Sequence, residues 1–138
     1  MALTKPSFTM ISGQESGTFT PVASGGTTTT YYNQIGYYST DGVTCVLQWY
    51  MRVNSLGDGS ASAIGGVPFA NSSSTLNHAY GTRSYSGIAV SVVQLFAWMA
   101  PSVSTVSSLG STAAASGGSE LSTMQDGAYH MGSLTHFR

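Results

Sequence analysis

The stretch GVTCVLQWYMRV, residues 42–53, alternates between two kinds of side chain and decides the predicted fold. Every second residue is apolar, whereas the intervening positions include Gln48 and Arg52. Successive side chains of a strand point to opposite sides of a sheet, so a period of two indicates a β-strand with one buried face. We therefore predict an antiparallel core strand. Its buried face would carry Val43, Cys45, Leu47, Trp49, Met51 and Val53.

Turn sequences enclose this core strand and separate the shorter strand-like runs around it. Asp41-Gly42 precedes it, and NSLGDG (residues 54–59) follows it. Many short strands between Gly-, Pro- and Ser-containing turns favour an all-β fold, here an antiparallel β-sandwich or jelly roll. We expect one such domain over residues 17–138, preceded by an N-terminal arm or edge strand over residues 1–16. The other expected strands lie within residues 17–22, 27–40, 61–64, 76–85, 88–99, 103–107 and 128–134.

Two of these runs carry a specific expectation. Gly36 is expected to break the run at residues 27–40, because glycine weakens a strand interior. Residues 88–99 form the most apolar run, which predicts a strand apolar on both faces, either central in a sheet or beneath a subunit contact. Neither this run nor the N-terminus is long and apolar enough to predict a membrane span or a signal peptide.

The charge content is low and points away from charged partners. Charged residues make up 7% of the 138-residue chain, against a usual value of about 25%. The net charge is −1, and the four basic residues form no cluster, so we expect neither nucleic-acid nor membrane binding. Free monomers usually carry more charge, so part of the surface is expected to be covered in an assembly.

The sequence offers no constellation of catalytic or metal-binding residues. The only cysteine, Cys45, lies on the predicted core strand and is expected to be a buried structural thiol. Three histidines share no metal-ligand spacing, and the acidic residues fall mostly in predicted turns. We therefore predict a protein without enzymatic activity, with no catalytic site, no cofactor and no metal.

Several short motifs, taken in order, resemble a known structural module. They are GTFTP (residues 17–21), YNQIGYY (32–38), GGVPF (65–69) and GAY (127–129). The set resembles a β-sandwich module of tailed bacteriophages, found at the ends of tail fibres and in capsid decoration (cement) proteins. Members often contain G-x-[WF]-x-P, Y-x-x-Q-x-G-x-Y and G-L-P-F, and this chain departs from that pattern at Val67. The resemblance implies a trimeric structural protein of a virion.

The resemblance implies two alternative functions. The first is a capsid decoration protein on the outer capsid surface, where a homotrimer binds and stabilises the major capsid protein shell. The second is a receptor-binding tip of a tail fibre or tailspike, which recognises a host surface glycan or protein. In the first case, Tyr-rich faces would pack between subunits and the N-terminal arm would dock on a neighbour. In the second case, exposed tyrosines would stack on sugar rings. The candidate interface residues are Phe8, Ile11, Tyr31, Tyr37, Tyr80 and Tyr85.

Overall fold

The computed structural model describes residues 13–88, 90–114 and 118–138, and this part of the chain contains strands and no helix. All strand pairings are antiparallel, so the all-β expectation is confirmed. The strands are β1 (Glu15–Phe19), β2 (Val22–Ala23), β3 (Thr30–Thr40), β4 (Thr44–Ser55), β5 (Ala63–Gly65), β6 (Ala79–Ser86), β7 (Gln94–Met99), β8 (Val106–Ser111), β9 (Ser119–Glu120) and β10 (Tyr129–Phe137).

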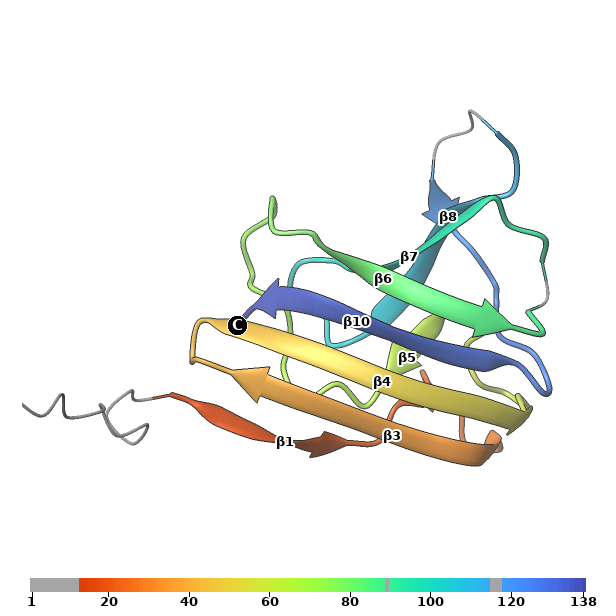
Figure 1. Cartoon of the computed structure of the whole chain (residues 1–138), viewed down its shortest axis with the longest axis horizontal. Helices are drawn as coiled ribbons and strands as arrows, with labels where there is room; N and C mark the ends of the chain where they lie inside the picture. Colours follow the sequence, from red (N-terminus) through yellow and green to blue (C-terminus); the bar gives the residue numbers. More distant parts are fainter. Residues whose placement is uncertain (1–12, 89, 115–117) are drawn as a thin grey trace, which may run out of the picture.

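The strands form one curled sheet, in the order β1-β3-β4-β10-β6-β7-β8-β5-β2, with β9 paired to β8. The final strand, β10, lies between β4 and β6 (Figure 1). Strands β1 and β2 lie at opposite ends of this order, although only Thr20 and Pro21 separate them in the chain. The two ends of the sheet must therefore approach each other, and the sheet curls into a half-barrel.

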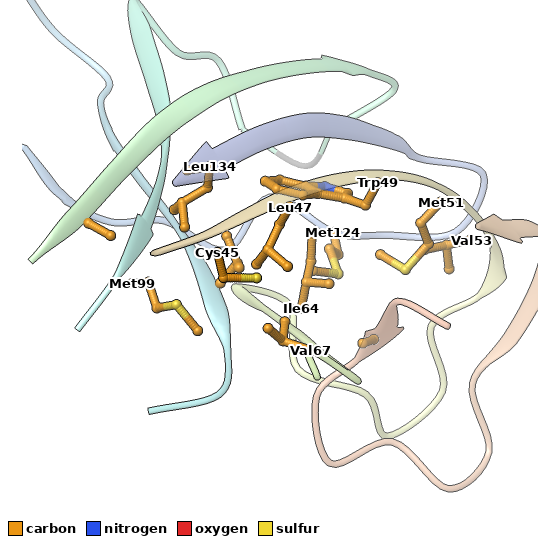
Figure 2. Close-up of a cluster of buried hydrophobic side chains, with 14 residues drawn as sticks. Cys45, Leu47, Trp49, Met51, Val53, Ile64, Val67, Met99, Met124 and Leu134 are labelled. Carbon is orange, nitrogen blue, oxygen red and sulfur yellow. The ribbon is translucent and has the colours of Figure 1, made fainter. Parts of the chain in front are cut away.

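Strand β4 supplies the centre of the hydrophobic core, as its alternation predicts. Cys45, Leu47, Met51 and Val53 are fully buried, and Trp49 is nearly so. Figure 2 shows these side chains packed with Ile64, Met99, Met124 and Leu134, which come from distant parts of the chain.

Val43 is the one member of the predicted buried set that lies outside. Its side chain is 62% exposed, and β4 begins one residue later. The carboxylate of Asp41 accepts hydrogen bonds from the amides of Val43 and Thr44, so the turn extends to this point. Gly42 takes a positive φ of 92°, which glycine adopts without strain.

Gly36 does not break its strand, contrary to the prediction. Strand β3 runs without interruption from Thr30 to Thr40. Gly36 pairs with Phe19 of β1, and a Cβ atom at Gly36 would lie 2.5 Å from the Phe19 ring. The glycine therefore provides space for an aromatic ring from the neighbouring strand.

The most apolar run forms a shorter strand than predicted, because β7 begins only at Gln94. Before it, Gly87 has a positive φ of 65°, and its carbonyl oxygen accepts a hydrogen bond from the Gln125 side chain. Within β7, Leu95, Ala97 and Met99 are buried, whereas Phe96 on the other face is 45% exposed. The second apolar face predicted for this run therefore exists, and the described chain leaves it partly open to solvent.

Candidate interaction surface

The face of the sheet opposite the core is almost free of charge. We call it the outer face and define it as the side of β3, β4, β10, β6 and β7 that carries Val46, Gln48, Tyr50 and Arg52 of β4. The cross-strand register assigns the residues of the neighbouring strands to it. Arg52 is the only charged residue on this face, and the other polar positions are Ser, Thr, Asn and Gln.

Large apolar side chains are exposed on every strand of the outer face. They alternate with hydroxyl and amide side chains and form no continuous apolar layer. Covering these side chains with another protein would remove apolar surface from water, which is favourable. The exposed members are Ile35, Tyr37, Val46, Tyr80, Phe96, Met131 and Phe137.

The structure places the predicted interface tyrosines in three different environments. Tyr37 of β3 and Tyr80 of β6 are exposed on the outer face, although β4 and β10 lie between their strands. Tyr31 packs against the core, and its hydroxyl oxygen accepts a hydrogen bond from the Ala23 amide at 2.6 Å. Tyr85 is partly exposed and belongs to the opposite side of β6 from Tyr80.

The other two predicted interface residues, Phe8 and Ile11, lie outside the described residues. Sequence reasoning, conversely, missed Phe96, Met131 and Phe137. The sequence does hint at such residues, because apolar side chains also occupy alternate strand positions that should be polar. In β4, for example, Val46 and Tyr50 lie at such positions. That signal shows that a strand has two apolar faces, but not which one the core covers.

An apolar groove of about 370 Å³ lies at the β7 end of the outer face, where residues of β6, β7 and β8 line it. Its walls include the rings of Tyr80 and Phe96 and the side chain of Leu109. Tyr80 pairs with Trp98, the neighbour of Phe96 on the same face of β7. This concave groove can receive a protruding apolar side chain.

Arg52 lies between two aromatic rings of the outer face. Its Cζ atom is 4.4 Å from the centroid of the Tyr32 ring and 4.6 Å from that of the Tyr129 ring. The Tyr50 ring meets Tyr129 edge-on, with 6.4 Å between centroids. Aromatic faces attract cations, so these tyrosines hold the planar guanidinium in one orientation.

A second arginine, Arg83, is buried on the inner side of β6 beside His130 of β10. Its Nη2 atom donates a hydrogen bond to Nδ1 of His130 at 2.8 Å, because a guanidinium can only donate. The histidine proton therefore resides on Nε2, which is buried and has no hydrogen-bond partner in the described chain. Burial, together with the nearby guanidinium, lowers the pKa of His130 to about 3, and burial lowers the pKa of Arg83 to about 10.

The remaining titratable groups with a shifted pKa serve the backbone or the core. The amides and hydroxyls of Thr27 and Thr28 hold the pKa of Asp58 well below its usual value. Hydrogen bonds from Thr44 and Val43 act in the same direction on the pKa of Asp41. Burial raises the pKa of the Cys45 thiol, which agrees with the structural role predicted for it.

No described group of three or more His, Cys, Asp and Glu side chains is arranged to hold a metal ion. The described part of the chain also contains no helix that is long and apolar enough to cross a membrane. Comparisons with protein-family models, with characterised proteins and with solved structures gave no match for this chain. The outer face is therefore the feature on which a functional proposal can be based.

Proposed function

We propose that the chain is a non-enzymatic structural protein of a bacteriophage virion, a decoration protein that binds the outside of the capsid. The observation that carries this proposal is the outer face, with its exposed apolar side chains and a single charge. A decoration protein covers other subunits over a wide area, and a sheet face with exposed apolar side chains and a single charge suits such contacts. The sequence motifs that resemble phage modules support the same class of protein.

In this proposal the protein assembles as a homotrimer of sandwich-like domains and contacts the major capsid protein. The effect is mechanical, because each contact removes apolar surface from water. Burial stabilises an interface by about 25 cal/mol per Å² before the entropic cost of association is subtracted. The shell then resists the outward pressure of the packaged DNA better with the protein bound than without it.

The test compares virions that carry this protein with virions from which it has been deleted. Virions without it should release their DNA at lower temperature and after milder osmotic shock. Adding back the purified chain should restore resistance, whereas a variant with Val46, Phe96 and Met131 replaced by threonine should not. Equal resistance of the two kinds of virion would overturn the proposal.

The exposed tyrosines of the outer face favour a second candidate, a tail-fibre or tailspike tip that binds a host surface glycan or protein. Tyr37 and Tyr80 present rings suited to stacking on a sugar or on an apolar partner surface. Gold labelling of a tagged copy on intact virions separates the two candidates. Label over the whole shell supports the decoration protein, and label at the tail end supports the adhesin.

A further inference from the structure

The guanidinium of Arg52 lacks the counter-charge that a stacked arginine commonly has. Among the described residues it forms no ion pair, and its Nε atom is buried without a hydrogen-bond partner. Arg138 offers the contrast within the same chain. It also stacks on an aromatic ring, Phe69, at 3.7 Å, but its Nη1 atom lies 3.9 Å from a carboxylate oxygen of Glu15.

Aromatic rings take up part of the space around the Arg52 guanidinium. The Tyr32 and Tyr129 ring centroids both lie within 4.6 Å of its Cζ atom. A planar guanidinium binds a carboxylate through its edge, with two parallel hydrogen bonds. Because the rings already restrict rotation of the side chain, less conformational entropy is lost when a carboxylate binds.

The positions beside Arg52 supply groups that hydrogen-bond to hydroxyls. The register forms a row across four strands of the outer face, with Asn33 of β3, Arg52 of β4, Tyr129 of β10 and Ser86 of β6. Three strand spacings make this row about 14 Å long. Tyr32, 61% exposed, adds an open ring next to the row. Amide, phenol and hydroxyl groups around an exposed ring are the usual components of a saccharide site.

We propose that this row is a binding site for a saccharide that carries a carboxylate. The carboxylate pairs with the N–H groups of Arg52, the sugar ring lies against the part of the Tyr32 ring that Arg52 leaves open, and a sugar hydroxyl bonds to the neighbouring Asn33. Charge complementarity selects the acidic sugar, since Arg52 is the only charge on the outer face and has no acid partner among the described residues. The inference goes beyond the decoration role, and it requires the Arg52 end of the outer face to stay open when the protein is bound to other subunits.

The experiment uses the full chain and two matched sugars, methyl β-D-glucuronide and methyl β-D-glucoside, which differ only in the carboxylate. Binding is followed by two-dimensional NMR titration of the backbone amides. The glucuronide should shift the amides of Arg52, Tyr129 and Asn33 in a saturable way, and the glucoside should bind at least about tenfold more weakly, because it lacks the charged pair. Equal binding of both sugars, or binding of neither, would overturn the proposal.

Variants and a peptide complete the test. Arg52→Gln should weaken glucuronide binding about tenfold or more, and Arg52→Lys should weaken it nearly as much, because an ammonium lacks the planar fork. Arg138→Gln, the matched control, should leave it unchanged. If the blocked tripeptide Ala-Glu-Ala binds at Arg52 more tightly than the glucuronide, the site is a contact for protein carboxylates and the saccharide proposal is wrong.

Discussion

The inner and outer faces of β4 are built from alternate residues of one strand, yet they differ in what they contact. Leu47 and its neighbours on the inner face are sealed in the core, whereas Val46, one residue away, is 43% exposed. Both faces contain apolar side chains, so hydrophobicity alone does not separate them. The difference lies in what the rest of the chain covers. A side chain stabilises the monomer only where another part of the fold removes it from water.

The largest expected effect comes from the same truncation on each side of this strand. Leu47→Ala should lower the free energy of unfolding by about 3 kcal/mol, because it leaves a cavity in the core. Val46→Ala should lower it by less than about 0.5 kcal/mol, as is usual for surface positions. Urea unfolding followed by tryptophan fluorescence measures both. A similar loss for Val46→Ala would show that the outer face is covered in the free protein.

The second prediction adds volume to the inner face. A Cβ atom at Gly132 would lie 2.5 Å from the carbonyl oxygen of Thr82 and 2.6 Å from the Trp49 ring. Gly132→Ala should therefore cost about 3 kcal/mol, at the upper end of typical overpacking. Gly65→Ala is the matched control, because its Cβ meets no atom closer than 3.4 Å. If the two variants unfold at the same urea concentration, the tight packing of Trp49 against β10 is refuted.

The third prediction concerns pH and the buried pair of the inner face. Native His130 stays neutral down to about pH 3, whereas in the unfolded chain it takes up a proton as the pH falls through 6.5. The free energy of unfolding that neutral His130 contributes is fully present above pH 6.5, and it is lost progressively as the pH falls toward 3. Between pH 6.5 and 4.5 this loss is on the order of 2 kcal/mol.

Urea unfolding at a series of pH values tests this window against a variant. His130→Asn keeps an acceptor for Arg83 and removes the titrating ring, so its stability should fall less steeply over the same range. Burial also lowers the pKa of His136, so a smaller slope in the same direction should remain. An unchanged slope in the variant would show that His130 is not the group responsible.

Substitutions on the outer face should have the smallest effect on the stability of the monomer and the largest effect on its assembly. Replacing Val46, Phe96 and Met131 by threonine should change the stability of the monomer by less than about 0.5 kcal/mol per site. The same variant should sediment as a monomer, whereas the parent chain should sediment as the proposed trimer. Identical sedimentation of the two proteins would remove the outer face from the proposed assembly.

Much of the local structure could be predicted because it depends on neighbouring residues alone. Alternation in residues 42–53 gave the buried face of β4 except at Val43, and the predicted limits lie two residues before those of the strand at both ends. The errors arose where a residue distant in the sequence determines the local structure. Gly36 remains within a strand because the Phe19 ring of β1 occupies the space beside it. The run at residues 88–99 was predicted too long because apolar content does not reveal where strand pairing begins.

The candidate site shows the same limit more clearly. Tyr37 and Tyr80 are exposed, whereas Tyr31, which was indistinguishable from them in sequence, packs inward. The stacking around Arg52 was not predicted at all. Its two tyrosines come from β3 and β10, and no local pattern indicates that these strands both flank β4.

The sequence by itself therefore determined the strand class, the positions of the main turns and the inward face of the core strand. These depend on the two-residue period of an extended backbone and on the conformational preferences of Gly and Asp. The tertiary structure alone decided that β10 lies between β4 and β6, that the sheet curls, and which apolar face stays open. Strand order depends on how side chains far apart in the chain bury one another. The local alternation of residues within a strand carries no information about that packing.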